Sequence, residues 1–127
     1  MMHGIGNNLV KDIMLTPFKN DMFSMMYKAF KNLYPDKVCE IWWDTDLENR
    51  HEGKTTIGDC SYCEDGRVYV DISVNLTVLE AAETLIHELA HVALGEENPS
   101  HDEEWEQARQ AIIEEYNKMY VKGNNNE

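Results

Sequence analysis

The chain has 127 residues, of which 43% are hydrophobic, and its formal net charge is −13 at pH 7. This length suits one domain with one hydrophobic core, and the composition is that of an ordinary globular protein. The negative charge repels phosphate backbones, so we expect no direct binding to nucleic acid, and basic substrates or partners are the electrostatic expectation.

The sequence shows no sign of export or of membrane insertion. Residues 1–8 are too polar for the apolar region of a signal peptide, and no apolar run approaches the length of a membrane span. Three cysteines without a signal peptide are typical of a reducing compartment. We therefore expect a cytoplasmic protein that does not contact membranes. The Cys60-x-x-Cys63 pair is interpreted as free thiols near a turn, because only Cys39 could join it.

A helix is expected before the first strand. Residues 1–8 are expected to be disordered, and residues 9–15 to form a short helical turn. Thr16 is suited to cap a helix that has Pro17 in its first position, and the helix should end at Tyr34, before Pro35. Apolar residues recur at helical spacing and predict the face that packs on the core: Phe18, Met22, Met25, Ala29 and Leu33, with Met26 and Phe30 beside them.

Three short strands should follow. Residues 38–43 are rich in strand-forming residues, and residues 54–60 are interpreted as a second strand. His51, in the charged loop between them, is not assigned to a metal. Asp65-Gly66 indicates the turn before the third strand, residues 67–74. In that strand apolar residues alternate strictly with other types, which predicts burial of one face only: Val68, Val70, Ile72 and Val74.

Residues 84–95 contain the pattern His-Glu-x-x-His. His87 and His91 are four residues apart, so they lie on one face of a helix and can bind one metal ion together. Glu88 lies about 100° round the helix axis and can reach a water molecule at that metal without being a ligand. This is the arrangement of zinc peptidases. The opposite half of the helical wheel is apolar: Val78, Ala82, Leu85, Ile86, Leu89, Ala90 and Ala93.

The motif helix should begin after a cap at Asn75 or Thr77 and end near Leu94. Gly95 is the expected C-cap, in the left-handed conformation.

A third metal ligand is expected after the motif helix, because a catalytic zinc usually takes three protein ligands and leaves one position for water. His101 follows a turn at Asn98-Pro99 and stands at the start of the next helix, for which Ser100 is the expected N-cap and Glu103 the matching acid. We predict His101 as the third ligand. The alternative is Glu114 on the last helix, as in peptidases whose third ligand is a glutamate.

The last helix should run from about His101 to Met119 and end in a disordered tail, residues 122–127. Its core-facing residues are expected to be Trp105, Ala108, Ile112 and Tyr116.

These residues resemble the SprT-like zinc metallopeptidases. The resemblance rests on His87-Glu-Leu-Ala-His91, on Gly95, and on His101 followed by an acidic residue and Trp105. Upstream, Gly58-Asp-Cys60 and the strand before the motif helix are also similar to the family. The chain differs from the family in two respects. Asp102 stands where the family usually has glycine, and no cysteine-rich zinc ribbon follows Cys63.

The resemblance implies a minimal zincin-like α+β fold, in which a small three-stranded sheet carries packed helices and the motif helix precedes a ligand loop and a C-terminal helix. It also implies that an edge strand of the sheet binds an extended peptide by strand addition. Either residues 54–60 or residues 67–74 could be that edge. We expect one domain over residues 1–127.

We therefore predict a zinc-dependent metallopeptidase with one zinc ion per chain, bound by His87, His91 and His101. A water molecule that zinc activates would hydrolyse peptide bonds of a protein or peptide substrate, with Glu88 as general base. The alternative function is a non-catalytic acidic zinc-binding protein that binds a basic partner or mimics nucleic acid. Donors to the developing oxyanion are suggested by residue type alone: Arg67, Tyr69, Tyr116 and Tyr120.

Overall fold

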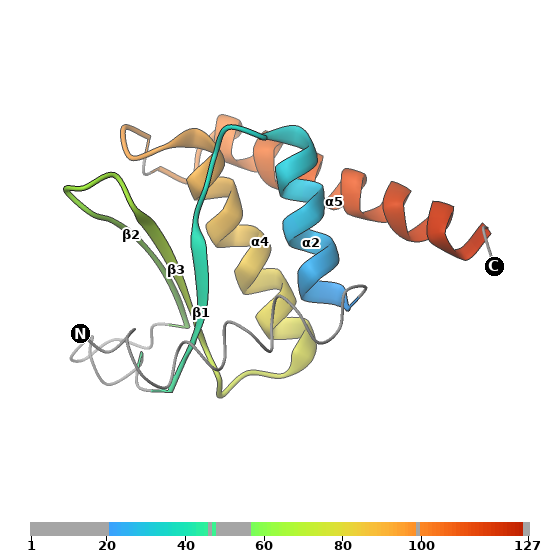
Figure 1. Ribbon diagram of the computed structural model, residues 1–127, viewed down its shortest axis with the longest axis horizontal. Coiled ribbons are helices and arrows are strands. Elements are labelled where there is room, and N and C mark those ends of the chain that lie inside the picture. The colour runs from blue at the N-terminus through green and yellow to red at the C-terminus, as the bar shows by residue number, and fades with distance from the viewer. Residues whose placement is uncertain (1–20, 46, 48–56, 99, 126–127) are drawn as a thin grey trace.

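The fold is a small mixed sheet with helices packed on one face (Figure 1). The structure is a computed structural model, which describes residues 21–45, 47, 57–98 and 100–125. Its elements, in chain order, are α2 (Met22–Leu33), β1 (Glu40–Asp44), β2 (Gly58–Tyr62), β3 (Val68–Ser73), α4 (Val78–Leu94) and α5 (Glu103–Asn125). Helix α4 packs on β2 and β3, and α5 packs across α2 and α4. The predicted α+β class is confirmed. No described helix is long and apolar enough to span a membrane.

The sheet has the strand order β1-β3-β2. Strand β1 is parallel to β3, and β2 is antiparallel to it. Strand β3 is therefore central and cannot be the peptide-binding edge. Of the two predicted edges only the second strand qualifies, and β2 lies at one edge of the sheet that the described residues form. The hairpin between β2 and β3 closes through Gly66, whose N–H donates to Cys63 O at 3.0 Å and whose φ of 89° favours glycine.

Strand β2 covers different residues from those predicted. It includes Ser61 and Tyr62, which the sequence assigned to a turn, while residues 54–56 lie outside the described part of the chain. His51 also lies outside it. The turn signal at Asp65-Gly66 is correct, but the hairpin is tighter than expected, so two more residues of the chain pair with β3.

The prediction that the third strand is buried on one face only is wrong. Asp71 and Ser73 are 2% and 1% exposed, as deeply buried as the apolar residues between them, whereas Val74 is 42% exposed. The outer face of the sheet is not open to water here, since Trp42 of β1, which pairs with Asp71, is itself 3% exposed. A period-two pattern tells which residues share a face but not whether that face meets water.

Helix α2 begins later than predicted. Asp21 is extended and caps the helix, since its Oδ1 accepts from Phe23 N at 2.8 Å and from Ser24 N at 3.0 Å. The expected start at residues 16 and 17 lies outside the described part of the chain. The end is as predicted, because Tyr34 is the C-cap. The buried apolar residues are Met26, Ala29 and Phe30, while Leu33 is 37% exposed. The packing face is thus rotated from the predicted one.

The hydrophobic core lies between the sheet and α4, with α2 and α5 behind it. Its most buried members come from every layer, and each has an exposed fraction of 0%: Phe30, Val70, Leu85, Leu89, Ala90 and Ile112. Burial of large apolar side chains of this kind stabilises a fold by about 1.5–3 kcal/mol each. This packing holds α4 rigidly against β2 and β3, so the polar face of α4 has a fixed position at the open side of the molecule.

Candidate metal centre

Helix α4 carries three of the four predicted site residues. It starts with a capping box, in which Glu80 N donates to Thr77 Oγ1 at 3.1 Å and Thr77 N donates to Glu80 Oε1 at 2.9 Å. Thr77 is therefore the cap, of the two residues predicted. Of the predicted apolar half of the helix, the residues from Ala82 to Ala93 are buried in the core, but Val78 in the first turn is 62% exposed. His87 and His91 lie on the opposite face, one turn apart, with ring centroids separated by 5.0 Å.

The chain after α4 turns back and brings His101 to these two histidines. Gly95 ends the helix at φ 88° and ψ 173°, and its N–H donates to His91 O. The positive φ is as predicted, but the ψ value is extended rather than that of a left-handed helix. Residues with this combination are almost always glycine. The extended step directs the chain away from the helix axis and allows the loop to return over the histidine face.

The ring nitrogens of the three histidines converge. His101 Nε2 lies 2.9 Å from His91 Nε2 and 3.1 Å from His87 Nε2. These atoms all lie within 4.8 Å of one another, and the described residues contain no other such group of His, Cys, Asp or Glu. A tetrahedral zinc site with Zn–N bonds of about 2.0–2.1 Å has its nitrogens about 3.3 Å apart. The three side chains are thus placed closely enough to hold one metal ion. Glu114, the rival ligand, is exposed on α5 and is not part of the group.

The protonation of His87 and His91 also suits a metal. Burial lowers the pKa of His87 to about 4, and the neighbouring imidazoles and Arg109 contribute in the same direction. Burial followed by the charge of His101 lowers the pKa of His91. Neutral imidazole is the form that binds metals, because the ligand lone pair must be free. At neutral pH no proton has to leave His87 before a metal ion binds.

Helix α5 contacts His87 and His101 through Trp105. Trp105 Nε1 donates to His87 O at 3.2 Å, and its ring lies 4.9 Å from the rings of His87 and His101, centroid to centroid. The core-facing residues of this helix were correctly predicted in part. Ala108 and Ile112 are buried, whereas Trp105 and Tyr116 are half-buried.

The predicted cap of this helix is wrong. Asp102, not Ser100, is the N-cap, since Asp102 Oδ1 accepts from Trp105 N at 3.1 Å and Asp102 O accepts from Glu106 N at 3.0 Å. The helix begins at Glu103, later than the sequence suggests. This explains the departure from the family pattern at Asp102, because the residue after the third histidine here has a capping role.

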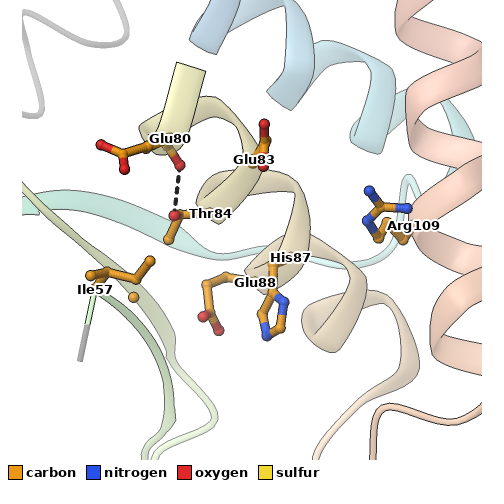
Figure 2. Close-up of a pocket in the computed structure, with 8 residues that line it drawn as sticks. Ile57, Glu80, Glu83, Thr84, His87, Glu88 and Arg109 are labelled. Atoms are coloured by element: carbon orange, nitrogen blue, oxygen red, sulfur yellow. Dashed lines mark hydrogen bonds between the residues drawn. The ribbon is translucent and has the colours of Figure 1, made fainter. Parts of the chain in front are cut away.

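Glu88 lies beside the triad and is 6% exposed. Burial raises the pKa of this carboxyl to about 8, and the charge of Asp59 adds to the shift. Figure 2 shows the carboxylate next to the His87 ring, both directed toward the same space below α4. A buried carboxyl group with a raised pKa, next to metal-ligand side chains, is the physical setting of a general base.

Two adjoining cavities open on either side of Glu88. The first, here the Arg109 cavity, has a volume of about 610 Å³ (Figure 2). It is lined by Ile57, Gly58, Glu80, Glu83, Thr84, His87, Glu88 and Arg109. The second, here the β2 cavity, has a volume of about 290 Å³ and follows β2 past all three histidines. Gly58, His87 and Glu88 line both, so the two cavities adjoin at Glu88 and are here called the two halves of the cleft.

Of the suggested oxyanion donors, the three whose side chains the structure describes do not line this cleft. Arg67 lies at the far end of the hairpin, where it pairs with Asp65 at 2.9 Å and donates to the Tyr69 hydroxyl at 3.3 Å. Tyr116 packs against the core, and the side chain of Tyr120 lies outside the described part of the chain.

Two residues that the sequence analysis missed line the cleft instead. Tyr62 lies in the β2 cavity, with its hydroxyl donating to His91 O at 3.1 Å, and Arg109 lies in the other cavity. The sequence analysis missed Tyr62 because it assigned this residue to a turn, whereas Tyr62 is the last residue of β2. Arg109 follows Trp105 by four residues, and this helical spacing was the signal that could have found it.

The cysteines are free thiols, as interpreted from the sequence. Burial raises the pKa of Cys39 to about 12 and that of Cys60 to about 11. Cys60 lies within β2 and lines the β2 cavity, while Cys63 is exposed at the hairpin. The high pKa values keep the thiols of Cys39 and Cys60 protonated and weakly reactive.

An α+β fold with three convergent histidines and a buried glutamate on a His-Glu-x-x-His helix is the layout expected of a zincin-like protein. Comparison with known protein families matches residues 20–125 to the SprT-like family. The chain belongs to the SprT-like family, as its motifs predict. Neither the curated proteins nor the solved structures gave a match.

Proposed function

We propose that this protein is a zinc-dependent metallopeptidase in which His87, His91 and His101 bind one zinc ion and Glu88 is the general base. The observation that carries the proposal is the convergence of three imidazole nitrogens beside a carboxyl that is 6% exposed and lines a cleft. Membership of the SprT-like family supports it.

The donor set favours zinc over other common cations. Three imidazole nitrogens suit zinc, whereas calcium and magnesium prefer oxygen ligands. The described residues place no fourth ligand with the triad, and the cleft opens onto it, which supports a catalytic rather than a closed structural site. When bound, zinc supplies a Lewis acid and lowers the pKa of water toward about 7.

Glu88 would move the proton. Its position lets the carboxylate take a proton from the attacking water and deliver it to the leaving amine. The raised pKa of Glu88 would fall once a cation is bound by the triad, because an opposite charge nearby favours the carboxylate form. Burial helps in a second way, since it keeps the carboxyl away from bulk water that would otherwise compete for its hydrogen bonds.

Strand β2 would align the substrate. It lies at an edge of the sheet and lines both halves of the cleft. An extended peptide that pairs with its outer edge would pass beneath α4, past the triad and Glu88. A protein or peptide with an accessible extended segment is therefore the proposed substrate.

The test compares two site variants with one control. His101→Ala should lose zinc, measured as metal content after dialysis. Glu88→Gln should keep the fold and about one zinc per chain but lower peptide hydrolysis by about a hundredfold or more, because it has no base to take the proton. Glu114→Gln is the control, since Glu114 is exposed on the same helix that follows the triad, and it should change neither quantity.

Four outcomes would contradict parts of the proposal. Full zinc content in His101→Ala would remove His101 from the ligand set, and loss of zinc in Glu114→Gln would restore the rival ligand. Unchanged hydrolysis in Glu88→Gln would remove the general base. If the zinc-loaded protein cleaves no peptide bond in a broad peptide mixture, the acidic zinc-binding protein without catalysis is the better description.

A further inference from the structure

Arg109 occupies an unexpected place for a cation. It extends from α5 and lines the Arg109 cavity together with His87 and Glu88. Figure 2 shows it on the far side of His87 from Glu88, and on a different helix from both. No other Lys or Arg is among the described residues that line either half of the cleft. The whole chain has only 11 Lys and Arg against 24 Asp and Glu.

The positive charge of Arg109 is unfavourable for binding a metal cation at the three histidines. The guanidinium shares a cavity with His87, so it repels any cation that the triad binds. Proteins retain such local conflicts mainly where function requires them. Stability gives no evident reason for the arginine, because its ion pair with Glu106 is partly exposed and pairs of this kind contribute little.

Most donors of Arg109 are uncommitted. Its Nη1 donates to Glu106 Oε1 at 3.0 Å, and within the described part of the chain it makes no further hydrogen bond or ion pair. A guanidinium has five N–H donors. Its side chain is only 35% exposed, so the remaining donors are partly withdrawn from water while they border the cavity. Glu106 holds the group from one side and leaves the other side available to a ligand.

The other polar groups of the cavity indicate what that ligand is. Glu80 and Glu83, both exposed on α4, and Glu88 line the same space. A carboxylate entering it would meet three acidic side chains and one arginine, so the balance is repulsive. A neutral carbonyl oxygen meets no such repulsion and accepts a hydrogen bond from guanidinium. A peptide main chain presents such an oxygen at every residue, whatever its side chains.

We propose that Arg109 is a substrate-binding residue, which donates to a main-chain carbonyl oxygen of the peptide in the Arg109 cavity. This inference rests on the proposed peptidase function. The bond would hold the peptide on one side of the cleavage point, while pairing with β2 holds it along the other. Fixing the chain on both sides of Glu88 limits its freedom to leave the reactive alignment.

The experiment measures peptide affinity with and without the guanidinium. Arg109→Met keeps the apolar length of the side chain and removes its donors, and Arg109→Lys restores a single cationic donor group. On α5, Lys118 forms a comparable pair three residues from Glu115, and its side chain is 77% exposed, so Lys118→Ala is the matched control. Each variant is loaded with zinc and prepared twice. With Glu88 intact it is assayed for peptide cleavage, and in combination with Glu88→Gln it is used to measure peptide binding by calorimetry without cleavage. Circular dichroism checks the fold.

Four peptides of equal length distinguish a main-chain carbonyl oxygen from a carboxylate oxygen. Three have an amidated C-terminus and carry neutral, acidic or basic side chains, and the fourth has the neutral sequence with a free C-terminal carboxylate. Arg109→Met should raise KM and the calorimetric Kd about tenfold for all four and change kcat by less than about threefold, the split expected when an interaction is common to ground and transition states. Arg109→Lys should recover part of the affinity. Lys118→Ala should match the wild type.

Each other result has a definite meaning. A loss confined to the acidic peptide or to the free carboxylate overturns the main-chain assignment in favour of an anion subsite. If the wild type cleaves the peptides and Arg109→Met has the same KM and Kd as Lys118→Ala, the role of Arg109 is overturned and the proposed peptidase function is not. A zinc-loaded wild type that neither binds nor cleaves any of the peptides overturns the proposed function itself.

Discussion

At the scale of single residues, the absence of a side chain at Gly58 lets β2 lie close to the Glu88 carboxyl. A Cβ at this position would lie 2.4 Å from Thr84 Cγ2 and 3.0 Å from Glu88 Oε2. The first distance is too short for any real contact, so the Thr84 side chain, β2 or α4 would have to shift. Gly58 does not have a positive φ, and close approach is therefore the reason for glycine here. This contact helps to bury Glu88.

The burial of Glu88 predicts a pH dependence for the protein stripped of metal by a chelator. The pKa of Glu88 is raised from 4.5 to about 8, so between these values the folded state binds a proton that the unfolded state releases. The stabilisation from this proton is complete below about pH 4.5 and is lost as the pH rises to about 8. Relative to Glu88→Gln, the wild type should therefore lose free energy of unfolding across this window.

Denaturant unfolding of both proteins at several pH values measures this difference. Groups that titrate alike in the two proteins cancel, including His87, whose lowered pKa acts with the opposite sign. A difference that stays constant from pH 4.5 to pH 8 would mean that Glu88 is already ionised in the folded protein and less desolvated than its position indicates.

At the scale of elements, the beginning of α5 determines where His101 lies. The N-cap Asp102 immediately follows His101, so the capping bond to Trp105 N fixes the backbone next to His101. Asp102→Ala should lower the free energy of unfolding by about 1 kcal/mol, the usual effect of losing a cap. It should also weaken zinc binding, because His101 would no longer be held in place before metal arrives.

A competition titration with a chromophoric chelator measures the zinc affinity. Asp102→Asn serves as the control, since asparagine caps helices about as well as aspartate but lacks its charge. The Asp102→Asn variant should keep both its free energy of unfolding and its zinc affinity near those of the wild type. If Asp102→Asn loses as much zinc affinity as Asp102→Ala, the charge of Asp102 matters for metal binding and the cap does not.

The same scale shows how far the sequence alone could lead. The positions of His87, Glu88 and His91 relative to one another follow from the helical repeat, and the turn after Gly95 made His101 the natural third partner. The cap at Asp102, the Tyr62 hydroxyl and Arg109 depend on where β2 and α5 begin and on how they cross α4. Those are matters of packing between segments far apart in the chain, about which local patterns carry little information. The predicted single domain and the zinc itself stay predictions.

At the scale of the whole molecule, the charge is uneven as well as negative. The first turn of α5 carries Glu103, Glu104 and Glu106, directly after the third histidine. Acidic residues at this end of a helix interact favourably with the exposed N–H groups. Together with a net charge of −13, they surround the cleft with a negative potential. Such a potential attracts both a divalent cation and a basic polypeptide.

The same potential argues against direct binding of this chain to nucleic acid. Affinity for DNA comes largely from Lys and Arg that neutralise phosphates, and non-specific DNA-binding proteins reach a Kd of about 10⁻⁴ to 10⁻⁶ M at physiological salt. The chain has 11 Lys and Arg, and of these Arg67, Arg109 and Lys118 are each paired with an acidic side chain. We expect no complex with duplex or single-stranded DNA at protein concentrations up to about 100 µM, measured by fluorescence anisotropy with zinc present.

A positively charged peptide of similar length is the matched ligand and should bind more tightly as salt is lowered. A micromolar complex with DNA at physiological salt would show that a local basic surface outweighs the overall charge.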